Sequence, residues 1–202
     1  MTINALILSG AALIVLNAAP VFAQQADTTT SNPPTINQRK DNQQDRIANG
    51  VQSGQLTAGE TKNLETKEAG INKEESGMRA EDDGHLTSAD RSLVNRQQNH
   101  LSNQIYDDKH NANTAHYGNN EVGQRRENQQ DRIAQGIKSG QLTAGETAKL
   151  ERQQQSINHE DASMRAADGG KLTGADKAAL NQRQNRASKN IYAKKHNGRT
   201  QK

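Results

Sequence analysis

The chain contains no cysteine and no tryptophan, so neither disulfide bonds nor thiolate metal sites can hold its fold together. Its only phenylalanine, Phe22, lies near the N-terminus, and the other aromatic residues are Tyr106, Tyr117 and Tyr192. A chain with so few large side chains has little to bury. Its composition lies near the border between a helical protein with a thin core and a disordered one.

Long apolar runs are absent except between residues 5 and 19, where the run is followed by the sequence PVFA. Val21 and Ala23 are small residues at the positions that a signal peptidase recognises, so we predict a signal peptide over residues 1–23. A membrane anchor is the alternative, but the run is shorter than the roughly 20 residues that a span needs. We expect a secreted or periplasmic protein with no membrane span after removal of the signal.

Motifs of the common enzyme classes are also missing. The sequence has no Gly-rich phosphate loop, no G-x-S-x-G elbow and no Cys/His pair. The acidic residues lie beside Lys and Arg at helical spacing, which is typical of a solvated helix face. We therefore predict no enzymatic activity, no catalytic residues, and no cofactor or metal ligands.

What the chain does have is an internal repeat. Residues 38–110 recur as residues 124–196, shifted by 86 positions without a gap, and 41 of the 73 aligned positions are identical. We predict a tandem duplication with a signal peptide (1–23), a flexible leader (24–35), helical repeat one (36–109), a linker (110–123), helical repeat two (124–196) and a disordered tail (197–202). No specific partner follows from the repeat itself.

Each repeat contains a shorter repeated motif that marks helix boundaries. The sequence GQLTAGE begins at Gly54 and at Gly140, and related sequences begin at Gly84 and Gly170. Glycine is favoured just after a helix, and a threonine followed three residues later by an acid is typical of a helix start. The pairs are Thr57–Glu60, Thr87–Asp90, Thr143–Glu146 and Thr173–Asp176. In repeat one they predict three helices, over about 36–49, 58–80 and 88–109.

The middle helix of each repeat has a narrow apolar seam. Leu64, Ile71 and Met78 recur every seven residues, and this spacing places them on one face. Their equivalents are Leu150, Ile157 and Met164. Units this small are marginal on their own, so the repeats are expected to pack on each other, to dimerise or to remain as mobile helices. The predicted fold is an all-α protein with a thin core, built from two three-helix units (a helical hairpin plus a helix), with flexible termini and linker.

Charge is shared unequally between the two repeats. Residues 38–110 have 10 basic and 13 acidic side chains, and residues 124–196 have 14 basic and 8 acidic ones. Opposite net charges favour attraction between the repeats, within one molecule or between molecules. The basic residues that we single out are Arg125, Arg126, Arg132, Arg183, Arg186, Lys189, Lys194 and Lys195. Binding of anionic envelope polymers is one expectation, whereas specific recognition of nucleic acid would need aromatic platforms that are nearly absent.

The spacing of the glycine, leucine and final acid resembles a degenerate EF-hand. With Leu as the eighth loop position, the loops are 49–60, 79–90, 135–146 and 165–176. The resemblance implies calcium binding, and loop 79–90 offers Glu81, Asp83 and Asp90 as ligands. The first position, an acid in EF-hands, is Asn49, Arg79, Gln135 or Arg165. Helix capping alone explains the same residues without a metal.

The same LT-x-x-E/D segments, at Leu56, Leu86, Leu142 and Leu172, also resemble the LTxxQ motif of periplasmic helical proteins such as the chaperone Spy. An acid stands here in place of the glutamine. This resemblance implies a helical surface that shields or senses other proteins. Asp107 and His110 could contribute to a weak zinc or copper contact, but solvated polar residues are the simpler interpretation. We predict a non-enzymatic, exported interaction or stress protein with chaperone-like character; calcium binding and polyanion binding through repeat two are the alternatives.

Overall fold

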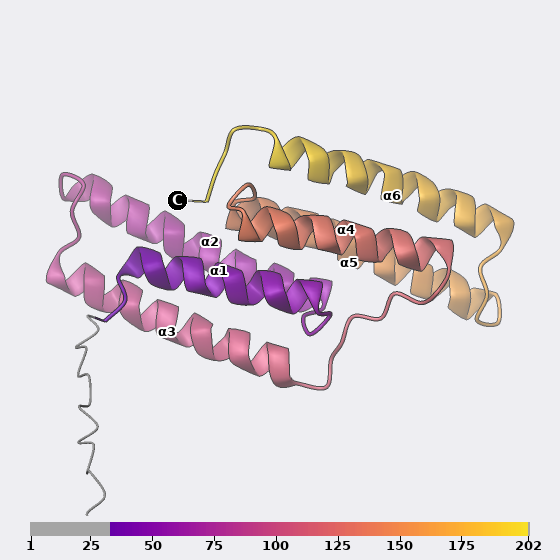
Figure 1. Ribbon diagram of the computed structural model, residues 1–202, viewed down its shortest axis with the longest axis horizontal. Coiled ribbons are helices and arrows are strands. Elements are labelled where there is room, and N and C mark those ends of the chain that lie inside the picture. Colours follow the sequence, from indigo (N-terminus) through magenta and orange to yellow (C-terminus); the bar gives the residue numbers. More distant parts are fainter. Residues whose placement is uncertain (1–32, 202) are drawn as a thin grey trace, which may run out of the picture. The chain divides into compact units, whose positions relative to one another are not determined.

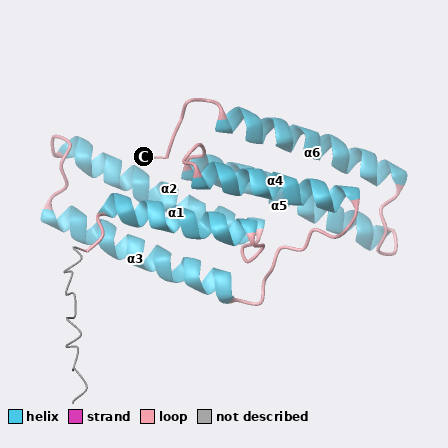
Figure 2. Cartoon of the chain, in the orientation of Figure 1, coloured by secondary structure: helices cyan, strands magenta, loops and turns pink. Residues whose placement is uncertain are grey.

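The computed structural model describes residues 33–201, which form six α-helices and contain no β-strand (Figures 1 and 2). The helices are α1 (Ile36–Gln52), α2 (Ala58–Glu81), α3 (Ser88–His110), α4 (Glu121–Lys138), α5 (Ala144–Ala167) and α6 (Gly174–Lys195). The predicted all-α fold is confirmed. The predicted signal peptide and residues 24–32 of the leader lie outside the described residues. Within the described part, no helix has the length and apolar character needed to cross a membrane.

Four helices begin at the capping threonines that the sequence predicts. Each threonine hydroxyl accepts a hydrogen bond from the backbone N–H of the acid three residues later, and that acid accepts one from the threonine N–H. These caps are Thr57, Thr87, Thr143 and Thr173. Helix α4 differs, because Asn120 caps it and it begins at Glu121, three residues before the predicted start of repeat two.

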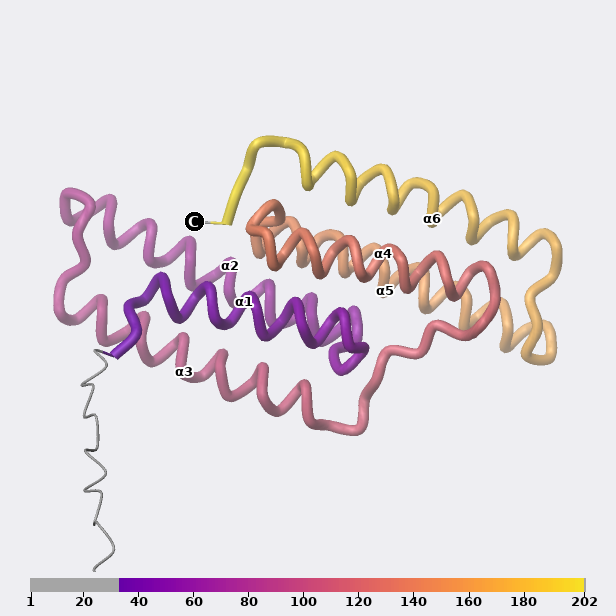
Figure 3. Tube along the Cα trace, in the orientation of Figure 1, coloured from indigo at the N-terminus to yellow at the C-terminus, as the bar shows by residue number. Residues whose placement is uncertain are grey.

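The two repeats pack on each other, which is the first of the three expected outcomes. Helix α2 packs against α5 and α1 packs against α4, while α3 contacts only helices of repeat one and α6 only helices of repeat two. In the trace, α3 and α6 accordingly lie at opposite edges of the described helices (Figures 1 and 3). The outer helices are therefore the elements whose surfaces remain most available to partners.

The apolar core extends across both repeats. Leu64 and Leu150 of the predicted seam are buried together with Ile47, Ile133 and other residues of α1–α6. A second, smaller cluster contains Val122, Ile157, Leu180 and Ala187. Met78 and Met164, at the ends of the seam, are only partly buried against these clusters.

Polar side chains supply much of the remaining interior. The amide of Gln44 donates to Glu65 at 3.3 Å, and the equivalent Gln130 donates to Glu151 at 2.9 Å. Gln43 donates to the Gln98 carbonyl at 2.6 Å. The interpretation of the acids as a solvated face is therefore wrong for the buried ones, which are Glu65, Glu68, Glu75, Glu146, Glu151 and Asp161. Hydrogen bonds to a neighbouring helix partly compensate for the loss of water around Glu65 and Glu151.

The segments after α3 and α6 follow equivalent paths. Ala115 N–H donates to the Gly54 carbonyl at 2.9 Å, and Gln201 N–H donates to the Gly140 carbonyl at 2.9 Å. The segment after His196 thus returns to the turn between α4 and α5. The linker does the same in repeat one, because these turns expose backbone carbonyls that accept a hydrogen bond from a returning chain.

Candidate anion-binding site

The eight basic residues singled out in repeat two fall into two groups in the structure. Four are used inside the fold: Arg126 pairs with Asp161 at 3.2 Å and Arg183 with Glu160 at 2.7 Å, while Arg132 donates to a backbone carbonyl and Arg125 donates to Asn185. The other four stay at the surface of α6. Arg186 and Lys189 are exposed, and Lys194 and Lys195 are half-buried.

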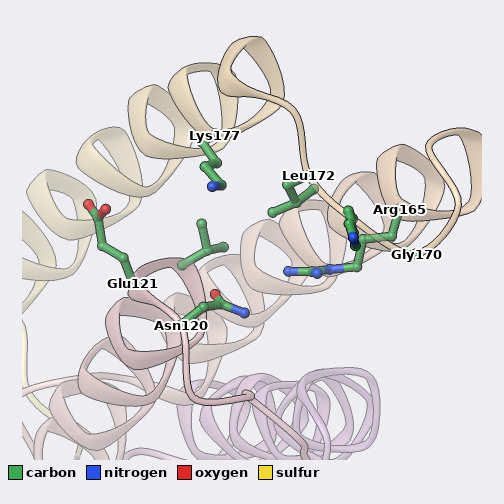
Figure 4. Close-up of a pocket in the computed structure, with 8 residues that line it drawn as sticks. Asn120, Glu121, Arg165, Gly170, Leu172 and Lys177 are labelled. Atoms are coloured by element: carbon green, nitrogen blue, oxygen red, sulfur yellow. The ribbon is translucent and has the colours of Figure 1, made fainter.

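A cavity of about 360 Å³ lies at the end of repeat two where α4 begins, α5 ends and α6 begins (Figure 4). Its lining residues are Asn120, Glu121, Val122, Arg165, Gly170, Lys171, Leu172 and Lys177. Its three cations, Arg165, Lys171 and Lys177, come from α5, the following turn and α6. Only the tertiary structure brings them together. Sequence reasoning did not select Arg165, Lys171 and Lys177, and their presence in the basic repeat was the one available signal.

The electrostatics of this cavity favour an anion. Arg165 is held by Asp161, with Nε 3.0 Å from Oδ1, whereas the ammonium groups of Lys171 and Lys177 form no hydrogen bond or ion pair with the described residues. The backbone N–H groups at the start of α4 add a partial positive charge. Glu121 is the opposing charge in the lining, and the amide of Asn181 lies 3.5 Å from its Oε1 atom. The nearby acid Asp176 accepts hydrogen bonds from Thr173 in the cap of α6.

Burial makes the surface of repeat two more basic than its sequence suggests. Between residues 124 and 196 none of the 14 basic side chains is buried, but three of the eight acidic ones, Glu146, Glu151 and Asp161, are. In repeat one the buried acids, Glu65, Glu68 and Glu75, are accompanied by the buried base Lys40. The fold therefore buries acidic side chains of repeat two and leaves each of its basic side chains at least partly exposed.

Three buried carboxyl groups have pKa values shifted upward. Burial raises the pKa of Glu68 to about 7, partly offset by Lys40, and raises the pKa of Glu151 to about 8, partly offset by the hydrogen bond from Gln130. Burial also raises the pKa of Glu65 well above its usual value, and the charges of Glu68 and Glu151 act in the same direction. In all three cases burial removes water from around the carboxylate, which disfavours the charged form. The helix interface therefore shifts the pKa of these carboxyl groups although the chain has few apolar residues.

The final acid of each EF-hand-like loop serves in a helix cap. In loop 79–90, Asp90 accepts hydrogen bonds from the Thr87 backbone at 2.9 Å and from its hydroxyl at 2.5 Å, while Glu81 is the last residue of α2. In loop 49–60, Glu60 accepts from Thr57, Asn111 and Asn113. Among the described residues, no group of three or more His, Asp or Glu side chains is placed to hold a metal ion.

The histidine that we paired with Asp107 instead contacts a tyrosine. His110 stacks on Tyr106, with ring centroids 4.1 Å apart, and its Nδ1 lies 2.7 Å from the Tyr106 carbonyl oxygen. Tyr192 and His196 repeat this arrangement at the end of α6. The two tyrosines are the exposed large hydrophobic residues of the described chain. The stacking explains the i, i+4 spacing of these pairs without a metal.

Comparison with known proteins adds no assignment: no protein-family model, no curated protein and no solved structure matches this chain.

Proposed function

We propose that this chain is an exported, non-enzymatic interaction protein that binds anionic polymers of the cell envelope, or similarly acidic proteins, through repeat two. The observation that carries the proposal is the burial pattern, because no basic side chain of repeat two is buried while three of its acids are. A surface with such an excess of basic side chains attracts polyanions over a range of several ångströms, whatever the sequence of the polymer.

Two neighbouring features would contact the polymer. Arg186 and Lys189 lie on the exposed surface of α6, which contacts no helix of repeat one. Lys171 and Lys177 line the cavity at the start of the same helix. The cavity would take a single phosphate or carboxylate group, and the outer face of α6 would contact the groups that follow along the polymer. Flexible lysine side chains suit such a repeating ligand, since they act as point charges without fixed geometry.

Heparin binding by the mature chain tests this proposal. In calorimetry, affinity should fall by more than about tenfold when NaCl is raised from about 0.05 to 0.5 M. A variant carrying Lys171→Gln, Lys177→Gln, Arg186→Gln and Lys189→Gln should bind about tenfold or more weakly at fixed salt. Teichoic acid and an acidic protein are the second and third probes, and they separate the two classes of partner.

The matched control removes four charges from repeat one: Lys62→Gln, Lys73→Gln, Arg91→Gln and Arg96→Gln. It lowers the net charge equally, so it should weaken heparin binding by less than about threefold if the site lies in repeat two. Equal losses in both variants, or binding that does not respond to salt, would reject the proposal.

Chaperone-like activity, which the LTxxQ resemblance implies, stays a prediction. The mature chain should then suppress aggregation of an unfolding client at a low molar ratio. Absence of an effect on several clients would eliminate this role and leave polymer binding unaffected.

A further inference from the structure

An apolar groove lies between α2 and α3 of repeat one, away from the basic surface. It has a volume of about 340 Å³ and is lined by Lys67, Gly70, Ile71, Glu74, Gln97, His100 and Leu101. Ile71 and Leu101 are buried and form its apolar wall. At Gly70, a Cβ atom would meet no other atom within 4 Å. The groove is thus open where a side chain could have filled it.

Repeat two shows what fills the same position from within the chain. The residues equivalent to Gly70, Glu74 and Gln97 are Ser156, Glu160 and Arg183 in the 86-residue repeat. Arg183 crosses from α6 to α5, where its guanidinium lies 2.7 Å from Glu160 and donates to the Ser156 hydroxyl at 3.4 Å. In repeat two an arginine side chain therefore occupies the position of this groove. In repeat one Gln97 stands in place of that arginine.

We propose that the groove of repeat one binds an arginine side chain presented by a partner protein. Glu74 remains at the position where Glu160 pairs with Arg183, and it accepts a hydrogen bond from Gln97 at 2.6 Å, which leaves its second oxygen to pair with a guanidinium. The methylene groups of the incoming arginine would lie along Ile71 and Leu101, as long charged side chains commonly do on apolar surfaces.

The other charged group in the lining is directed elsewhere. Lys67 donates a hydrogen bond to Gln104 of α3, so its ammonium group has a partner outside the groove. The volume of about 340 Å³ also lies in the range of small-ligand sites. The groove thus combines one carboxylate with an apolar wall, which suits a cation carried on an aliphatic stem. This site is separate from the proposed polyanion surface, and each can fail without the other.

Titration with n-hexylguanidinium, followed by NMR of the Ile71 and Leu101 methyl groups, tests the site in the mature chain. These methyl resonances should shift in a saturable manner, and n-hexanol should bind more weakly because it lacks the charge. Glu74→Gln should weaken hexylguanidinium binding by about two- to fivefold, as expected for a partly exposed ion pair. The equivalent Glu160→Gln in repeat two should leave the shifts at Ile71 and Leu101 unchanged.

A variant with the residues of repeat two provides the decisive comparison. Gly70→Ser combined with Gln97→Arg should fill the groove with an internal arginine and abolish the saturable shifts, while circular dichroism shows that the helices are retained. Persistent binding in this variant would overturn the proposal. So would tighter binding of hexanol than of hexylguanidinium, which would indicate an acyl chain as the occupant. A dimer of the unmodified chain that this variant abolishes would assign the groove to a second copy and would also overturn it.

Discussion

Repeats one and two have nearly the same interior and different surfaces. Gln43 of repeat one donates to the Gln98 carbonyl and the Ser102 hydroxyl, and Gln129 of repeat two makes both equivalent bonds, with lengths that agree within about 0.2 Å. The outer helices α3 and α6 contrast with this, since α6 has six basic side chains and one acidic one, whereas α3 has three of each. The comparison shows that polar side chains between helices can be as constrained as an apolar core.

The largest expected effect tests whether the two interiors are equivalent. Leu64 and Leu150 are almost completely buried, at 0% and 2% exposure, so Leu64→Ala and Leu150→Ala should each lower the free energy of unfolding by about 2–5 kcal/mol. Urea denaturation of both variants measures the loss. Values that differ by more than about 2 kcal/mol would show that the repeats contribute unequally to one cooperative core.

A smaller effect concerns an interior position at which the repeats differ. Glu68 has a pKa raised to about 7, and its equivalent in repeat two is Gln154. The folded state keeps a proton on Glu68 that the unfolded chain releases near pH 4.5, so its contribution to stability is present below pH 4.5 and is lost as the pH rises to about 7. Glu68→Gln should remove this loss, on the order of 3 kcal/mol.

The measurement is the free energy of unfolding of both proteins at pH 4.5 and pH 8. The variant should match the unmodified chain at the lower pH and exceed it at the higher one. Equal differences at the two pH values would mean that Glu68 is not the titrating group.

Removal of the capping threonines should have an effect of about 1 kcal/mol. Thr57 and Thr143 cap α2 and α5 with the same geometry, so Thr57→Ala and Thr143→Ala should destabilise the protein similarly. Thermal melts monitored by circular dichroism would detect the loss. Thr66→Ala, on the exposed surface of α2, is the control and should change the melting temperature less.

The smallest expected effect stabilises the protein. Gly77 lies within α2, where a Cβ would meet no atom within 4 Å, and its equivalent is Ser163. Gly77→Ala should therefore raise the free energy of unfolding by about 0.5–1 kcal/mol. Gly50→Ala is the opposing control, because its Cβ would lie 2.7 Å from Leu56 Cδ1. Denaturation curves that move in the same direction for both would contradict the packing seen at Gly50.

Part of the interior could have been found from the sequence by a different use of the repeat. Gln43, Gln44, Glu65 and Gln98 are polar residues that are identical in both copies, and all four are buried. Their identity in the two repeats, together with the variation of exposed neighbours, was a signal for contacts between helices. The hydrophobic pattern did not reveal them, because it treats every polar residue as a surface residue.

The sequence by itself determined that the chain is helical and where most helices begin. A threonine, an acid three residues later and a preceding glycine act within one turn of backbone, so their effect does not depend on the rest of the fold. Only the tertiary structure decided which polar side chains are buried, that α2 packs against α5, and that Lys171 and Lys177 meet at one cavity. These features depend on which helices pair. The apolar seam is too narrow to specify the pairing, so contacts between residues distant in sequence decide it.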